Sequence, residues 1–177
     1  MLRFACFASM VIAMFAAFPV SAGNLPTDGN GPNTDNFCWE KSLDKDLQYM
    51  VAPIQSSKDL ATYLSTQGTD SPLNLLSQRG KRDFLESLTF NKKGLTGLRH
   101  DMLEKELTPT QIYRVLALFG EQALTTKLKN ARIETDLDRE IMATGQLKCS
   151  SGDRSNYKCE SRASCRSAAN YICLAAC

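Results

Sequence analysis

The chain has 177 residues, of which 43% are hydrophobic and 23% charged, and its 21 Lys and Arg residues nearly balance its 19 Asp and Glu residues. The length fits one domain, and the composition excludes a wholly disordered, collagen-like or polytopic membrane protein. Because the formal net charge is only +2, there is no extended positive field, and we expect no nucleic acid among the partners.

The first 22 residues have the pattern of a secretory signal peptide. Arg3 supplies a positive start, residues 4–18 are uncharged and largely apolar, and Val20-Ser21-Ala22 offers small residues for cleavage. The apolar stretch is shorter than the roughly 20 residues that a spanning helix needs. We therefore expect cleavage after Ala22, no transmembrane anchor after cleavage, and a secreted or periplasmic protein.

Residues 23–37 are rich in Gly, Asn, Pro, Asp and Thr, which predicts a polar flexible leader. Residues 38–147 have helical periodicity and predict a helical domain. Its first helix has one apolar face and ends at Pro53. That face comprises Leu43, Leu47, Met50 and Val51.

Further helix starts are marked by capping residues and by proline at the first helical position. They are Ser56 or Ser57, Ser71-Pro72, Thr108-Pro109 with Gln111, and Thr135 with Asp138. Residues 87–98 allow two interpretations. Apolar residues flank the turn Asn91-Lys92-Lys93-Gly94 and would suit a hairpin, but we favour the helical interpretation there.

The last part of the chain, residues 148–177, predicts a Cys-rich appendage. Its first half is rich in Ser, Gly, Asp and Asn and predicts a loop closed by Cys149 and Cys159, and Ser161 to Ala176 predicts a last helix because it is rich in alanine. The expected fold class is all-α: one small domain of about seven short helices with a disulfide-stapled C-terminal segment.

Export makes the cysteines candidates for disulfides. Cleavage of the signal peptide removes Cys6 and leaves an even number, which predicts paired cysteines in an oxidising compartment and no metal cluster. Five of them lie in the last segment, so at least one bridge must leave that segment if all pair within the chain, and Cys38 is its only partner. The disulfide candidates are Cys38, Cys149, Cys159, Cys165, Cys173 and Cys177.

The sharpest catalytic candidate is His100-Asp101, which includes the only histidine of the chain. A histidine beside an aspartate on a helix, in an exported disulfide-rich helical protein, is similar to the core of the secreted phospholipases A2. That resemblance implies that His100 would act as base on a water molecule and that Asp101 would help to hold calcium. The helix cysteines that flank the family motif are missing here. The plainer interpretation of His100 is a solvated or capping residue.

Two charged clusters have simpler structural explanations. Carboxylates alternate from Glu134 to Glu140, but an EF-hand calcium loop starting at Asp136 would place Ile141 and Leu147 where glycine and glutamate are needed. We therefore expect no metal and no cofactor. The tail carries bases that could meet an acidic partner or anionic lipid, or simply face solvent. They are Arg154, Lys158, Arg162 and Arg166.

No sequence motif supports an active site beyond His100-Asp101, which favours binding over catalysis. The leading hypothesis is an exported, disulfide-bonded helical protein that binds an unknown protein partner, as an inhibitor or immunity protein of the cell envelope or as a secreted effector. The alternative is a small secreted hydrolase with phospholipase A2-like chemistry at His100-Asp101.

Overall fold

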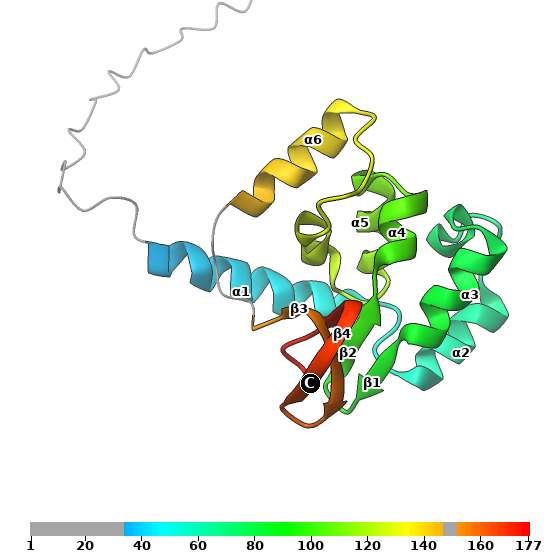
Figure 1. Cartoon of the computed structure of the whole chain (residues 1–177), viewed down its shortest axis with the longest axis horizontal. Coiled ribbons are helices and arrows are strands. Elements are labelled where there is room, and N and C mark those ends of the chain that lie inside the picture. Colours follow the sequence, from blue (N-terminus) through cyan, green and yellow to red (C-terminus); the bar gives the residue numbers. More distant parts are fainter. Residues whose placement is uncertain (1–33, 147–151) are drawn as a thin grey trace, which may run out of the picture. The chain divides into compact units, whose positions relative to one another are not determined.

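The computed structural model describes residues 34–146 and 152–177, without the side chains of residues 34–42 and 146 (Figure 1). The predicted signal peptide, the predicted leader up to residue 33, and Cys149 lie outside these residues. Residues Asn33–Cys177 form one unit. Among the described helices, none combines the length and apolar composition that a membrane crossing requires.

Helices are the commonest elements of the described chain, and the four helix starts predicted from capping residues are confirmed. Ser56 accepts a hydrogen bond from the Asp59 N–H at 3.2 Å, and Thr135 accepts one from the Asp138 N–H at 3.1 Å. The α-helices are α1 Thr34–Val51, α2 Ser57–Thr66, α3 Gln78–Ser87, α4 Asp101–Glu106, α5 Pro109–Ala117 and α6 Asp136–Ala143, and the short 3-10 helices are η1 Pro72–Leu75, η2 Gln122–Lys127 and η3 Thr144–Gln146.

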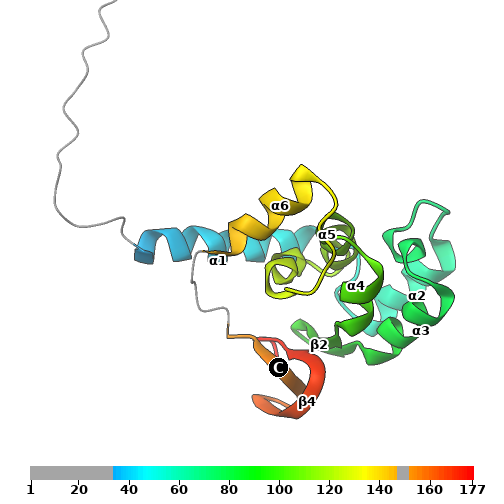
Figure 2. The ribbon, with the colours of Figure 1, turned by 45° about the horizontal axis from the view of Figure 1, so that its top comes forward.

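The described chain also contains a four-stranded antiparallel sheet, so the all-α prediction is wrong. Its strands are β1 Thr89–Asn91, β2 Gly94–Arg99, β3 Arg154–Ser161 and β4 Ser164–Cys173, in the order β1-β2-β4-β3. Two hairpins distant in sequence thus join through β2 and β4, as Figure 2 shows from a second angle. The fold class is α plus β.

The predicted last helix is strand β4, and much of the predicted loop before it is strand β3. Alanine gives residues 161–176 a helical propensity, but propensity is a weak local preference that tertiary pairing overrides. Leu98 of β2 pairs with Ile172 of β4, and Ile172, Cys173 and Leu174 are buried. Burial against a neighbouring strand and disulfide bonding together outweigh the small local preference.

Strand β4 contains a wide bulge. From the pair Ser155–Ile172 to the pair Tyr157–Ser167, β3 advances by two residues and β4 by five. The intervening residues of β4, 168–171, leave the ladder with β3, and the Cys165–Cys173 disulfide spans them with 6.3 Å between the Cα atoms.

The first hairpin corrects the preferred interpretation of residues 87–98. Helix α3 ends at Ser87, and Phe90 pairs with Leu95 across the turn at residues 91–94. Gly94 has a φ of +114°, a conformation that favours glycine. The hairpin alternative is therefore confirmed. The helical one fails because β2 is buried between its two neighbouring strands.

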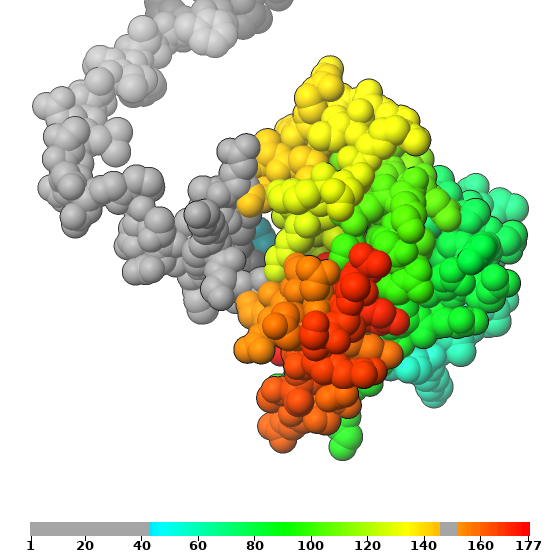
Figure 3. Space-filling view, in the orientation of Figure 1, coloured from blue at the N-terminus to red at the C-terminus, as the bar shows by residue number. Residues whose placement is uncertain are grey.

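The hydrophobic core lies between the sheet and the helices. Phe84 and Phe119 meet edge to face with ring centroids 6.0 Å apart. Figure 3 shows the C-terminal hairpin, orange to red, directly against the green middle of the chain. The largest fully buried side chains are Phe84, Phe119, Ile54, Leu73, Leu98, Leu103, Leu107, Ile112, Leu116, Leu124, Leu128 and Ile172.

Helix α1 packs on this body through Tyr49. Gly94 and Gly120 leave the space for it: a Cβ at position 94 would come within 2.6 Å of the Tyr49 ring, and one at position 120 within 2.6 Å of the Tyr49 Cα. Gln55 closes the end of the helix, because its Nε2 donates to the Tyr49 carbonyl at 2.9 Å.

A charged cluster also holds α1. Lys45 Nζ lies 3.2 Å from Glu121 Oε2 and 3.9 Å from Asp153 Oδ1, and Lys127 Nζ lies 2.8 Å from Asp153 Oδ2. The Ala175 N–H also donates to Asp153, at 3.0 Å. Burial raises the pKa of Glu121, and the Lys45 ammonium opposes that rise. The side of α1 that faces the body is thus polar and aromatic.

Candidate functional site

His100 is the N-cap residue of α4, directly after strand β2. Its Nδ1 lies 2.9 Å from Glu104 Oε2, one helical turn away. Glu104 is buried, and its other oxygen, Oε1, accepts the Asn130 N–H at 3.0 Å. The histidine ring is therefore oriented by a carboxylate that is itself held in place.

Asp101 has different partners from His100. Arg99 donates to both of its carboxylate oxygens, at 2.5 and 3.0 Å, and Lys105 lies 3.3 Å away. Chiefly through the hydrogen bond from Arg99, its pKa is lowered to about 2, although burial opposes this shift. No described contact joins the side chains of His100 and Asp101. Catalysis by this pair stays a prediction.

The alternating carboxylates of α6 separate into one buried and several exposed groups. Asp138 accepts hydrogen bonds from the Thr110 N–H and hydroxyl at 2.8 and 2.6 Å, and from the N–H groups of Glu134 and Thr135 at 3.0 and 2.9 Å. Burial acts to raise the pKa of Asp138, but these hydrogen bonds outweigh it and leave the pKa well below its usual range. One carboxylate therefore links the N-termini of α5 and α6.

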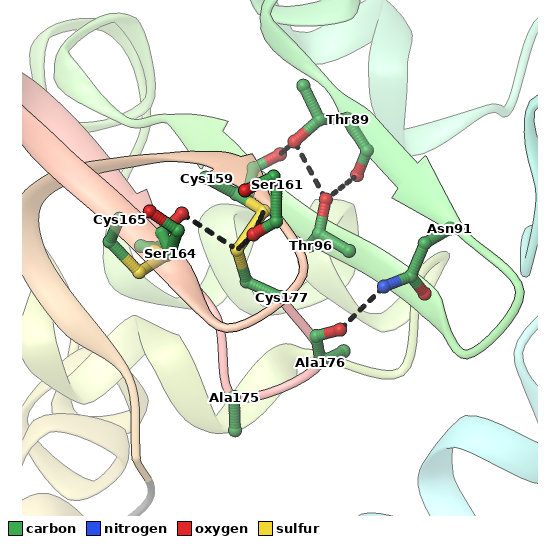
Figure 4. The surroundings of a disulfide bond; sticks show 12 residues. Thr89, Asn91, Thr96, Cys159, Ser161, Ser164, Cys165, Ala175, Ala176 and Cys177 are labelled. Atoms are coloured by element: carbon green, nitrogen blue, oxygen red, sulfur yellow. Dashed lines mark hydrogen bonds between the residues drawn. A yellow bond between two sulfur atoms is a disulfide. The ribbon is translucent and has the colours of Figure 1, made fainter.

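Four of the predicted cysteines form two disulfides, Cys159–Cys177 and Cys165–Cys173. The predicted closure of the loop by Cys149 and Cys159 is wrong, because Cys159 bonds to Cys177 (Figure 4). The predicted bridge from Cys38 to the tail falls outside the described side chains.

One surface groove lies beside the Cys159–Cys177 disulfide and has a volume of about 760 Å³. It runs between the tips of the two hairpins, and Figure 4 shows Asn91 reaching from one side to the Ala176 carbonyl, at 2.6 Å. Lys92, Lys93 and Arg162 line it without a carboxylate partner in the described part of the chain, and Glu160 is paired with Arg166.

The predicted tail bases lie on a β-hairpin rather than on the predicted loop and last helix. Arg166 pairs with Glu160 at 2.9 Å, and Lys158 Nζ lies 5.2 Å from the centre of the Tyr171 ring. Arg154 and Arg162 are exposed. The four basic residues are therefore distributed over both strands and the turn between them.

The most unusual surface is the apolar face of α1, which we define as Leu43, Leu47, Met50 and Val51. Lys45 and Tyr49 are four residues apart and hold the opposite side of the helix to the body. The apolar face consequently points away from the core. The exposed fractions are 49% for Leu43, 51% for Leu47, 72% for Met50 and 81% for Val51.

A second groove, of about 590 Å³, adjoins this face. Asp44, Lys45 and Gln48 form its α1 wall. Asp44 and Gln48 neighbour Leu47 and Val51 on the helix surface. The opposite wall comes from α5, η2 and α6, with Tyr113, Leu137, Ile141 and Glu140 among its residues. The apolar face and the groove therefore form one continuous surface.

Sequence reasoning identified the apolar face but not its exposure, because a helical period shows which residues share a side and not what covers them. The groove was missed since its walls come from segments far apart in the chain. Comparison of the chain with protein-family models, with curated proteins and with solved structures found no match.

Proposed function

We propose that this protein is an exported, disulfide-bonded binding protein that captures a protein partner through the apolar face of α1 and the adjoining groove. The observation that carries the proposal is the outward orientation of Leu43, Leu47 and Met50. Contiguous exposed apolar surface in a folded protein is characteristic of interaction sites.

The anchoring of α1 supports this function. Tyr49 packs against Gly94 and Gly120, so the helix presents its apolar side on a fixed support rather than on a free tail. A preorganised surface loses less conformational entropy on binding. Covering the exposed parts of these side chains would contribute about 1 kcal/mol each.

Export is the second part of the proposal. The sequence begins with a predicted signal peptide, and two disulfides are characteristic of proteins in oxidising compartments. An inhibitor or immunity protein of the cell envelope is the role that we favour. A secreted effector acting on another cell would use the same surface.

Affinity capture tests the proposal. The full chain would be expressed with its own N-terminal segment, so that it is exported and oxidised. The purified protein would then be used to recover partners from envelope and culture fractions of its source. We expect one protein at near-equal amount that survives high salt and is lost with Leu47→Asp. Ile133→Asp is the matched control, because Ile133 is 48% exposed but lies outside the face and the groove. Equal recovery by all three proteins, or no partner, contradicts the proposal.

A second candidate is a small hydrolase with His100 as its base. The supporting observation is the hydrogen bond between His100 and the buried Glu104, since orientation by a carboxylate is common for catalytic histidines. Calcium-dependent hydrolysis of phospholipid vesicles that disappears in His100→Ala would support it. Activity unchanged in that variant, or absent from the unaltered protein, would remove it.

A further inference from the structure

We infer that the element received by the apolar face of α1 is an amphipathic helix with Lys or Arg along the edges of its apolar side. This inference rests on the proposed function and names the chemistry of the partner. It follows from the spacing of the exposed apolar residues and from the charges around them.

The spacing suits a helix. Leu43, Leu47 and Met50 follow one another at intervals of four and three residues, the spacing by which one helix packs along another. The second groove continues this surface toward α6, where Leu137 and Ile141 provide an apolar wall. Recognition of an amphipathic helix by a hydrophobic groove is a recurrent binding mode.

The charges specify the partner's edges. Asp44 and Asp46 lie on the two sides of the apolar face, and Glu140 lies on the far wall of the groove. None of these three carboxylates has a cationic partner among residues 43–145 and 152–177. Among the described residues that line the groove, the cations are Lys45, which is held by Glu121, and Arg114. A helix with basic edges would therefore complement this surface.

The same charges disfavour three other occupants. A second copy of α1 would bring Asp44 and Asp46 against their own equivalents, and an anionic membrane would repel them. The chain's own residues 23–33 contain no Lys or Arg, so they lack the complementary charge. A basic helix from another protein meets both the apolar and the electrostatic requirements.

Two synthetic helical peptides would test this inference. They share one apolar face of Leu residues and differ only in carrying Lys or Glu along its edges. Binding to the oxidised full chain is measured by fluorescence anisotropy at low salt. We expect the Lys peptide to bind at least tenfold more tightly than the Glu peptide. Leu47→Asp should weaken the binding of the Lys peptide at least tenfold. Ile133→Asp should change the affinity for this peptide by less than twofold.

Reversing the charges beside the apolar face tests whether they select the partner. In the double variant Asp44→Lys with Asp46→Lys, the Glu peptide should bind more tightly than the Lys peptide, and the difference should shrink as salt rises because surface charges are screened. Circular dichroism confirms that each variant is folded. Equal binding of both peptides, or a preference that charge reversal leaves unchanged, overturns the inference.

Other results separate this inference from the proposed function. If capture of a protein depends on Leu47 but not on Asp44 and Asp46, the proposed function stands and the inference of a partner helix with basic edges is rejected. Dimers that disappear with Leu47→Asp would show that a second copy covers the face. Leu47-dependent sedimentation with phosphatidylglycerol vesicles would show a membrane surface instead, and both of these results overturn the inference.

Discussion

The backbone of Tyr49 lies against Gly120 so closely that a Cβ at position 120 would come within 2.6 Å of the Tyr49 Cα. Gly120 also has a φ of +71°, a conformation that residues with a side chain rarely adopt. This one glycine both ends the helix-to-loop turn after α5 and makes room for α1. The orientation of the proposed binding face therefore depends on it.

Gly120→Ala should destabilise the protein and loosen α1. The left-handed conformation costs an alanine about 1 kcal/mol, and the forced displacement of a packed backbone costs about 1–3 kcal/mol more. Urea unfolding followed by circular dichroism measures the loss, and limited proteolysis at Lys45 reports the release of α1.

Gly68→Ala is the matched control for this prediction. Apart from the glycine and its two chain neighbours, no atom of the described residues lies within 4 Å of a Cβ placed at position 68. The stability of the protein should therefore change by less than about 0.5 kcal/mol in this variant. Equal stability of the two variants would contradict the packing of Tyr49 on Gly120.

Asp138→Asn should cost about 2–4 kcal/mol, because a buried carboxylate that accepts several hydrogen bonds cannot be matched by an amide, which accepts at only one of its two positions. The N-termini of α5 and α6 would each lose a partner. Chemical unfolding of the variant gives the value directly.

Asp136→Asn controls for charge on the same helix. The Asp136 side chain is 93% exposed and pairs only with Arg139 among the described residues, so the change should stay within about 0.5 kcal/mol. Similar losses in both variants would show that Asp138 contributes no more than surface charge.

The pairing of Asp101 with Arg99 should make stability depend on pH. The pKa of Asp101 is about 2 in the folded protein, below its ordinary 3.8, so the folded state favours the charged form. This contribution is complete above about pH 5 and is lost as the pH falls toward 2. Since Lys105 is largely exposed and Arg99 about one-third exposed, solvent screening reduces it to about 1 kcal/mol.

Urea unfolding of the unaltered protein and Asp101→Asn at several pH values tests this dependence. The two stabilities should differ by about 1 kcal/mol at pH 7 and converge near pH 2. A difference that stays constant between pH 7 and pH 2 would show that the carboxylate charge is not what stabilises this site.

Local chemistry predicted the helix boundaries better than the sheet. The caps Ser56 and Thr135 needed only neighbouring residues to act, and they act where the sequence places them. Strand β4 formed against its alanine-rich local preference because Leu98 pairs with Ile172, a contact that closes more than 70 residues. Such pairings carry no local signal.

The candidate site shows the same division. Helical spacing grouped Leu43 with Leu47, but their exposure follows from Lys45 and Tyr49 occupying the inner side of α1. The bulge at residues 168–171 was equally hidden, because it is defined by the pairing of β4 with β3, a contact that forms only on folding. Contacts formed by folding, rather than residue types, determine both features.

The disulfides allow a last prediction that rests on counting. Two bridges account for four cysteines of the tail, and cleavage of the predicted signal peptide removes Cys6. Cys149 is then the one tail cysteine left, so the predicted bridge between the tail and the front of the domain becomes Cys38–Cys149. It closes more than a hundred residues, and its removal by Cys38→Ala should cost about 4–5 kcal/mol in the chain-entropy model.

Peptide mapping without reduction checks the pairing. Trypsin leaves Cys173 and Cys177 in one peptide, so chymotryptic cleavage after Leu174 is needed to separate them. We expect three linked pairs, with the Cys149 peptide joined to the Cys38 peptide. Removal of the Cys165–Cys173 bridge, which closes only eight residues, should cost less, about 2–3 kcal/mol. A free thiol at Cys149, or a smaller loss for Cys38→Ala than for the short loop, would contradict a bridge between the two ends of the domain.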